Sequence, residues 1–294
     1  MRDPLSGGVI LCADDYGLSG GVSRGILELL EGRHINATSA MVTFPRWVGD
    51  APALAGVRSH SALGLHLNLT VGAPLGVMRR LAPDGALPTI GQATRLALSG
   101  KIDTGEIEAE TLRQLAAFET ATGFKPDHVD GHQHVHALPG FRRGVLAAMA
   151  AFYGELRPLV RDPADRWSTI IRRGGDTKKA LGLAMLASGF AAAARRHRFF
   201  TNRGFSGYST FDTKKPYAEE IAVALRYTEG GCIVMCHPGY PDAELAGRDP
   251  VLARRAQELE ALRGNAGVET HLTAIAREGD AAILDWGRLG AHGG

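Results

Sequence analysis

Short apolar runs alternate with amphipathic helical patterns along almost the whole sequence, and this alternation constrains the fold more than any other feature. Strand-like runs occupy residues 8–13, 37–44, 63–69 and 232–236, and segments with a 3.6-residue apolar period separate them. Strands that alternate with helices form parallel sheets through right-handed crossovers. Roughly seven or eight strands favour a barrel over an open sheet. The sequence therefore predicts an α/β fold, a TIM-like β/α barrel that is distorted or incomplete, as a single domain over residues 1–294.

Capping signals place the helices between these strands. Ser19 is suited to cap a helix that Gly32 ends. Further helices are expected over residues 47–55, 90–97, 106–122, 139–152, 178–196, 216–227 and 250–264, and further strands over 127–136, 156–160, 199–205 and 281–284. Residues 71–105 are rich in Gly and Pro and are expected to form a long functional loop. The Gly-rich tail over residues 287–294 is expected to be frayed.

Composition excludes several classes of protein. Apolar residues make up 45% of the chain, enough for a large core, and a net charge of +2 argues against a nucleic-acid binder. The three cysteines are too few and odd in number for a disulfide framework, so we expect reduced thiols, with a Cys232/Cys236 metal pair as the less favoured alternative. No signal peptide is visible, and the longest apolar run, 180–194, is too short to span a bilayer. A cytoplasmic enzyme is the resulting expectation.

Positive charge is concentrated in one segment. Residues 161–203 contain ten Lys/Arg and three Asp. We interpret this segment first as a solvated face or a homodimer contact. Contact with a membrane surface or an anionic glycolipid is the alternative.

The segment from Asp127 to His136 contains four histidines and two aspartates. His132, His134 and His136 alternate, so an extended backbone would place all three on one face. Neutral imidazole is the commonest protein ligand of zinc and related metals. The pattern predicts a metal site here. His128 and at least one of His134 and His136 are expected to be structural, since a catalytic site has few ligand positions.

Polar residues that follow other strands are expected to complete this site. Asp14 and Asp15 follow the first strand, His66 lies near the end of a later one, and His237 directly follows the run 232–236. In a β/α barrel the carboxyl ends of the strands converge on one face, where catalytic residues collect. At a turn, two adjacent aspartates can both approach one centre, one to bind a metal and one to accept a proton. The alternative is a pair of turn-forming aspartates that cap the next helix.

Four motifs together resemble one family of enzymes. They are Ala-Asp-Asp-Tyr-Gly-Leu-Ser at 13–19, Gly-Leu-His-Leu-Asn-Leu-Thr at 64–70, His-Val-Asp-Gly-His-Gln-His-Val-His at 128–136 with Pro139, and Met-Cys-His-Pro-Gly at 235–239. In this order they resemble the YdjC-like carbohydrate deacetylases, the family of the chitooligosaccharide deacetylase ChbG and the hopanoid-associated deacetylase HpnK. The resemblance extends from about residue 8 to residue 285. It implies a distorted β/α barrel that binds a divalent metal and removes acetyl groups from N-acetylated sugars.

The resemblance also implies roles at the matched positions. Asp15, His66 and His132 would be the metal ligands. Asp14 would be the general base that activates a metal-bound water, and His237 would be the general acid that protonates the leaving amine. The mixed oxygen and nitrogen ligands favour magnesium or zinc, with manganese or cobalt as alternatives.

Substrate contacts are less well indicated. Weak candidates are Tyr16, which replaces the family's Phe, and Asn68, His134, Arg161 and Arg203. The motifs concern the acetyl end of the substrate and leave open which sugar is bound, and whether it is an oligosaccharide or a glycolipid. The loop 71–105 and the segment 161–205 would decide this.

Two other functions compete with this interpretation. Residues 130–134 also match the Asp-x-His-x-His pattern of amidohydrolase-type metal hydrolases, which act on other amides. A barrel that starts near Val129 would keep only about 165 residues, too few for the usual size of roughly 250. The second alternative is a sugar-binding barrel that has lost catalytic activity.

Overall fold

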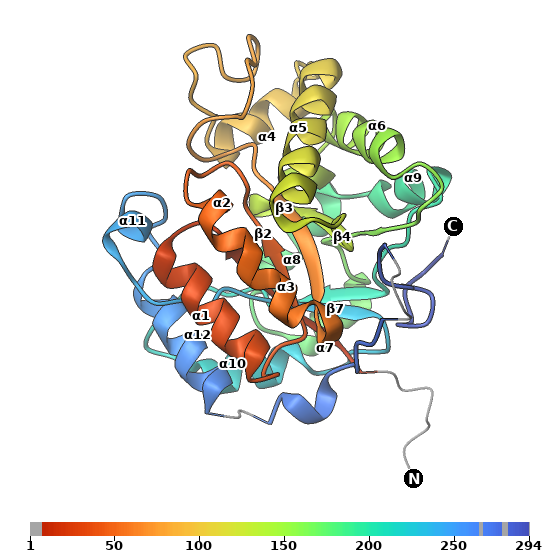
Figure 1. Cartoon of the computed structure of the whole chain (residues 1–294). Coiled ribbons are helices and arrows are strands. Elements are labelled where there is room, and N and C mark those ends of the chain that lie inside the picture. Colours follow the sequence, from red (N-terminus) through yellow and green to blue (C-terminus); the bar gives the residue numbers. More distant parts are fainter. Residues whose placement is uncertain (1–7, 265–266, 278–281, 294) are drawn as a thin grey trace.

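In the computed structural model, which describes residues 8–264, 267–277 and 282–293, seven parallel strands form one curled sheet surrounded by helices (Figure 1). The strands are β1 (Ile10–Tyr16), β2 (Ala37–Ala40), β3 (Ala62–Leu67), β4 (His128–Gly131), β5 (Leu159–Val160), β6 (Gly204–Ser206) and β7 (Cys232–Cys236). Their spatial order is β5-β4-β3-β2-β1-β7-β6. The predicted α/β class is confirmed, and the sheet fits a distorted, incomplete barrel in which β5 and β6 are the two edges.

The helices are α1 (Gly20–Glu31), α2 (Trp47–Asp50), α3 (Leu54–Val57), α4 (Ile90–Leu98), α5 (Thr104–Thr122), α6 (Phe141–Tyr153), α7 (Trp167–Arg173), α8 (Thr177–Leu186), α9 (Phe190–Arg196), α10 (Tyr217–Ala224), α11 (Ala243–Ala246) and α12 (Ala253–Arg263). Ser19 caps α1 as predicted, with its hydroxyl accepting from the Val22 amide at 3.3 Å. The first long helix and the last, α1 and α12, lie side by side (Figure 1). Within the described part of the chain, no helix is both long enough and apolar enough to cross a bilayer.

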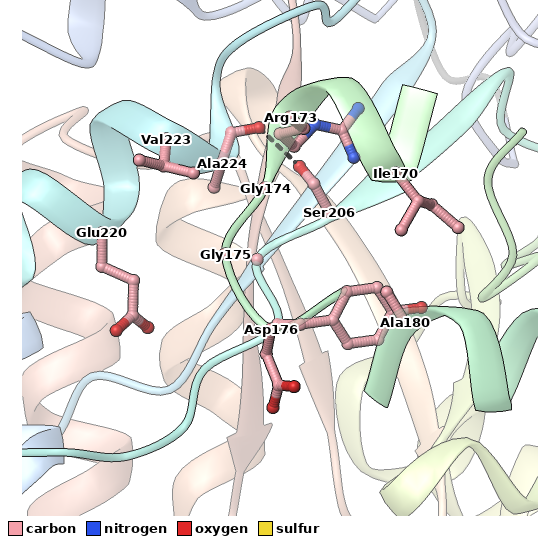
Figure 2. Close-up of a pocket in the computed structure, with 12 residues that line it drawn as sticks. Ile170, Arg173, Gly174, Gly175, Asp176, Ala180, Ser206, Glu220, Val223 and Ala224 are labelled. Atoms are coloured by element: carbon pink, nitrogen blue, oxygen red, sulfur yellow. Dashed lines mark hydrogen bonds between the residues drawn. The ribbon is translucent and has the colours of Figure 1, made fainter. Parts of the chain in front are cut away.

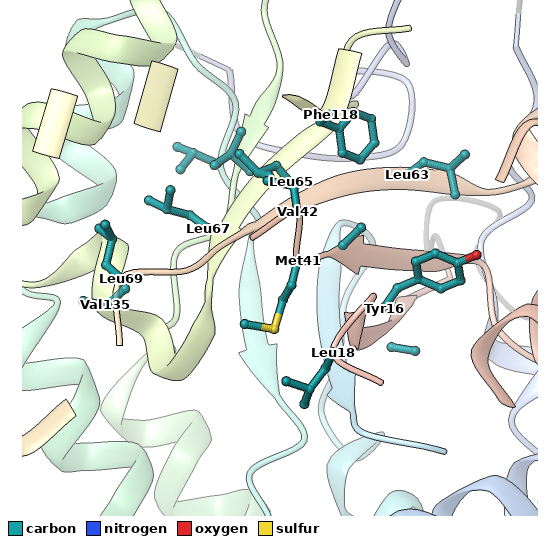
Figure 3. Close-up of a cluster of buried hydrophobic side chains, with 14 of the residues drawn as sticks. Tyr16, Leu18, Met41, Val42, Leu63, Leu65, Leu67, Leu69, Phe118 and Val135 are labelled. Carbon is teal, nitrogen blue, oxygen red and sulfur yellow. The ribbon is translucent and has the colours of Figure 1, made fainter. Parts of the chain in front are cut away.

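Alternation along the strands separates two apolar clusters. In β3, Leu63, Leu65 and Leu67 point towards the helices and pack in one core with Phe118 (Figure 3). In β1, Ile10 and Cys12 belong to a second cluster inside the curled sheet. Because successive side chains of a strand point to opposite faces, the next inward position after Cys12 is Asp14. The strand pattern therefore directs Asp14 into the interior of the sheet.

Several predicted elements differ from the structure. The single helix expected over 178–196 is two helices, α8 and α9, because Gly189 adopts a left-handed φ of 78°. The helices α7 and α11 were not predicted. Residues 282–284 of the strand expected over 281–284 are not a strand, and residue 281 lies outside the described residues. The amidohydrolase alternative is wrong about the start of the sheet, since β1, β2 and β3 precede the His-rich segment.

The end of the chain is packed rather than frayed as predicted for 287–294. Trp286 is buried, and its indole N–H donates to the Asp127 carbonyl at 2.6 Å. His292 pairs with Thr201 through two backbone hydrogen bonds of 2.8 and 3.0 Å. Residue 294 lies outside the described residues. The apolar Trp286 and this pairing anchor a segment whose glycines had suggested disorder.

Candidate active site

A bulge in β1 brings both adjacent aspartates into the interior. Pairing with β2 is regular up to Ala13 and resumes at Tyr16, so the strand contains an irregularity at residues 14–15. Asp15 has a left-handed φ of 75°, which an unstrained strand does not contain. β1 also pairs with β7 at Ala13 and Cys236, which places the aspartates beside His237. The bulge explains how neighbouring residues approach one centre, as the sequence predicted.

Asp15, His66 and His132 converge at the carboxyl edge of the sheet. Asp15 Oδ1 lies 3.2 Å from His66 Nε2 and 3.0 Å from His132 Nδ1. His66 belongs to β3, and His132 is the first residue after β4. One ligand atom from each residue lies within 4.8 Å of the other two. The structure thus brings together the three side chains that the resemblance implied as metal ligands.

The orientation of His66 suits a metal ligand. Its Nδ1 lies 2.6 Å from Asp130 Oδ1, so an Nδ1–H that donates to this carboxylate leaves Nε2 facing Asp15. Although burial opposes the charged imidazole, the carboxylates of Asp130 and Asp14 raise the pKa of His66 to about 10. This environment favours positive charge between the carboxylates. A divalent cation would satisfy the same preference and displace the proton.

One carboxylate and two imidazoles form a donor set that fits zinc or a harder divalent ion. Two other groups among the described residues come equally close together: Asp14, His66 and Asp130; and Cys12, His128 and Asp130. Both include Asp130, whose Oδ2 already lies 2.5 Å from the Arg161 guanidinium. Asp130 Oδ1 lies 2.6 Å from His66 Nδ1, so both oxygens of Asp130 are engaged, whereas Asp15 Oδ1 faces only the two histidines. The group that contains Asp15 is therefore the best candidate for a metal.

Arg161 fixes Asp14. It follows β5, is fully buried, and donates from Nη1 and Nη2 to both oxygens of Asp14 at 2.7 Å. Burial opposes the charged carboxyl, but the charges of Arg161 and His66 hold the pKa of Asp14 well below its usual range. Asp14 is thus an ionised carboxylate at neutral pH. Arg161, a weak candidate for substrate contact, has its guanidinium between Asp14 and Asp130 in this structure.

His237 lies directly after β7. Its backbone N–H donates to Glu258 Oε2 at 2.5 Å, and its ring meets the edge of Phe211 with centroids 5.8 Å apart. Desolvation lowers the pKa of His237 to about 4. The imidazole is therefore neutral at pH 7.

The helix α12 contacts both Asp15 and the turn that begins at His237. The sequence analysis did not predict these contacts. Arg255 Nη2 donates to Asp15 Oδ2 at 2.6 Å, and the Arg255 carbonyl accepts from the Gly239 amide at 3.2 Å. Glu258 holds the His237 amide. The stretch Ala-Arg-Arg-Ala-Gln-Glu-Leu-Glu-Ala-Leu-Arg has the composition of an exposed helix. One feature of the sequence could have indicated that these residues are buried. Leu259 and Leu262 form a narrow apolar stripe, and Arg255 and Glu258 lie on the same face of the helix.

The His-rich segment is not the extended strand that was predicted. β4 ends at Gly131, and His132–Ala137 form a tight 3₁₀ turn with left-handed φ angles of 53° at Gln133 and 60° at His134. His134 packs edge-on against Phe205 instead of joining Asp15. His136 donates from Nε2 to the Arg161 carbonyl at 2.7 Å. Alternation in the sequence therefore overestimated how many histidines share one face.

The remaining weak candidates lie away from the cluster. The Tyr16 hydroxyl donates to the Asp50 carbonyl at 2.8 Å. The amide of Asn68 is buried and donates to the Val71 carbonyl at 2.7 Å and to the Thr43 hydroxyl at 2.8 Å. Arg203 precedes β6 and so lies at the amino edge of the sheet, opposite the cluster. None of these three residues belongs to the group of Asp15, His66 and His132, and their contact with substrate stays a prediction.

Two neighbouring cavities flank the carboxyl end of β6. The smaller one lies between α7, β6 and α10, where Ser206 donates to the Ala224 carbonyl at 2.7 Å (Figure 2). The larger one, of about 300 Å³, is lined by Tyr208, Thr210 and Lys215 among others. Phe211, which lies against His237, belongs to the same loop. That loop therefore contacts both the larger cavity and His237.

Comparison with known proteins shows the family to which the chain belongs. Residues 8–270 match the model of YdjC-like proteins. The human carbohydrate deacetylase is 32% identical, over 81% of this chain and 77% of its own length. The chitooligosaccharide deacetylase of Serratia marcescens is 29% identical, over 81% of this chain and 83% of its own. An Enterococcus faecalis crystal structure, provisionally named for cellobiose-phosphate cleavage, shares the fold with a TM-score of 0.65 at 21% identity and covers 91% of this chain and 96% of its own. The resemblance seen in the four motifs is confirmed, and the chain belongs to the YdjC-like family.

Proposed function

We propose that this protein is a metal-dependent hydrolase that removes the acetyl group from an N-acetylated sugar. The observation that carries the proposal is the convergence of Asp15, His66 and His132 on one point. Asp14 in β1 and His237 directly after β7 each follow one partner of the pair Ala13 and Cys236, and flank that point. The names of the related carbohydrate deacetylases support the same reaction.

The five side chains divide the chemistry between them. A divalent cation held by Asp15, His66 and His132 would polarise the amide carbonyl and lower the pKa of water from about 15.7 towards 7. Asp14, kept ionised by Arg161, accepts the proton of the attacking water. His237 is neutral at rest, so it receives the proton that Asp14 has taken from the water and passes it to the leaving nitrogen as the C–N bond breaks.

The sugar ring would lie over Phe211. This ring is half-buried, lies next to His237, and belongs to the loop that lines the cavity of about 300 Å³. An aromatic ring presents a large apolar face at little cost in conformational entropy. We propose that this loop, together with the cavity, receives the part of the substrate beyond its acetyl group.

The test is acetate release from a panel of N-acetylated oligosaccharides and glycolipids. The purified protein is stripped of metal and reloaded with zinc, magnesium, manganese or cobalt. We expect release that depends on the metal from at least one substrate. Stoichiometric metal uptake without release from the whole panel would contradict the deacetylase and favour the sugar-binding alternative.

A further inference from the structure

Arg255 contacts the candidate metal ligand Asp15 from the side that faces away from the histidines. Asp15 Oδ1 faces His66 and His132, whereas Asp15 Oδ2 accepts from Arg255 Nη2 at 2.6 Å. Only 1% of each residue is exposed, so solvent does not compete for this contact. We propose that Arg255 is a positioning residue that restricts Asp15 to one metal-binding oxygen, an inference that rests on the proposed function.

The rest of the Arg255 side chain argues for a role in the site rather than in stability. Its Nε and Nη1 are buried and have no hydrogen-bond partner among the described residues. Leaving such donors unpaired costs free energy. Among the described residues, Nη2 donates both hydrogen bonds of the guanidinium, one to Asp15 Oδ2 and one to Asp249 Oδ2 at 2.5 Å. The group is therefore placed for these two carboxylates.

Asp249 holds Arg255 in position. Its Oδ1 accepts from the Val251 amide at 2.7 Å, which fixes the carboxylate in the turn before α12. Its Oδ2 then orients Nη2 towards Asp15. Two carboxylates sharing one guanidinium nitrogen keep Asp15 Oδ2 engaged. Only Oδ1 stays available to a cation between His66 and His132.

Substitution of Arg255 tests this role, with cobalt(II) as the probe. Arg255→Met frees Asp15 Oδ2 and removes a positive charge next to the ligand. We expect cobalt to bind about tenfold more tightly or better, because the repulsion is lost. We also expect visible absorption to weaken, because a second carboxylate oxygen raises the coordination number. Chelator competition and absorption titration measure the two effects without substrate.

Arg254→Met is the matched control. Arg254 is equally buried on the same helix, but it pairs with Glu220 at 2.5 Å, away from the cluster. It should leave cobalt affinity and absorption at the wild-type values. If Arg255→Met does not fold, Asp249→Asn keeps the arginine and weakens its anchor, and should shift both readouts in the same direction by a smaller amount.

Two results would overturn the inference. Wild-type protein that takes up cobalt, with Arg255→Met binding it equally or more weakly and with unchanged absorption, would overturn this inference alone. Wild-type protein that takes up no cobalt, zinc or magnesium would overturn the proposed function and this inference together. Acetate release by the wild type separates these cases further, since it depends on the proposed function and not on Arg255.

Discussion

At the scale of single residues, Asp14 and Asp15 show how neighbours in sequence acquire different chemistry. Both are buried carboxylates at one bulge, yet Arg161 holds both oxygens of Asp14, whereas Arg255 holds only one oxygen of Asp15 and the other faces two imidazoles. The difference lies in their partners and not in their burial. Each aspartate therefore supports a separate prediction of what its loss would do.

Asp14→Asn is expected to keep the metal and to lose turnover, by a factor on the order of 10² to 10⁴ typical of a missing general base. Arg161 keeps its pairing with Asp130 at 2.5 Å, so the variant should fold. His132→Ala is expected to lose both metal and turnover. Metal content by mass spectrometry and acetate release check the pair. Metal loss in Asp14→Asn, or turnover retained in either variant, would contradict the assigned roles.

Phe211→Ala is expected to raise KM several-fold with a smaller change in kcat, because the ring would contact the sugar and not the reacting atoms. Steady-state kinetics on the best substrate of the acetate panel measure the split. Val77→Ala, at a site that is 81% exposed, is the control for an unrelated apolar truncation. A fall in kcat alone would show that Phe211 acts through His237 instead.

Glu258 should make stability depend on pH. Burial raises its pKa from 4.5 to about 7. Between these values the unfolded chain ionises first, so native stability is full below pH 4.5 and falls as the pH rises towards 7, by at most about 3 kcal/mol. Glu258→Gln should flatten this slope while still accepting from His237. Urea unfolding at a series of pH values measures it, and Glu155→Gln, at a position 97% exposed, should leave the slope unchanged.

The residue types of the site could be predicted, but not all their contacts. Asp14, Asp15, His66, His132 and His237 follow strands, and the ends of parallel strands must meet. Arg161 was a weak candidate for substrate contact because it follows a strand. Its partners come from β1 and β4, and no local pattern links segments so far apart in sequence.

At the scale of elements, α12 and α1 together position the turn that contains His237. The glycines of α1 allow this turn to come close: a Cβ at Gly25 would lie 3.1 Å from Gly239 Cα. A Cβ at Gly21 would lie 2.1 Å from the Tyr240 carbonyl oxygen. The repeated glycines near the start of α1 are therefore a packing requirement of the loop after β7.

Gly21→Ala should move this loop and destabilise the protein by about 1 to 3 kcal/mol through overpacking. Turnover should fall with it, since the loop begins at His237. Gly91→Ala in α4, where a Cβ would meet nothing within 4 Å, is the matched control and should stabilise by up to about 1 kcal/mol. Urea unfolding and acetate release compare the two. Equal stability of the two variants would contradict the close packing.

Strands with strong apolar runs were predicted more reliably than turns. The run 232–236 is β7 residue for residue. The His-rich segment failed because an alternating pattern does not report backbone φ, and Gln133 and His134 adopt left-handed angles. The Ala-rich pattern is continuous across Gly189 and gave no indication of the break between α8 and α9, because this break also depends on a left-handed φ.

At the scale of the whole molecule, the end of the chain closes the amino side of the sheet. Asp127, just before β4, accepts from the Leu284 amide at 3.0 Å and from Arg277 Nη1 at 2.9 Å. Trp286 covers His128 with ring centroids 5.8 Å apart. The opposite side, at the carboxyl ends, contains the candidate active site. One side thus serves stability and the other chemistry.

Trp286→Ala should therefore lower the free energy of unfolding by about 3 to 5 kcal/mol, through the cavity that it leaves. At temperatures below unfolding, kcat/KM should stay at the wild-type value, because the change is at the far side of the sheet. Denaturant unfolding and acetate release measure the two quantities. A large loss of kcat/KM in folded protein would show that the two sides are coupled.

The strand order has a consequence for folding during synthesis on the ribosome. β1 lies between β2 and β7, and Ile10 pairs with Ile233. During translation the edge of β1 that pairs with β7 therefore has no strand partner until almost the whole chain has been made. At about 5–20 residues per second this wait is on the order of 10 s or more. A ribosome-bound chain halted before β7 lacks His237, so it should be inactive, and its bare β1 edge should be a site for chaperone binding.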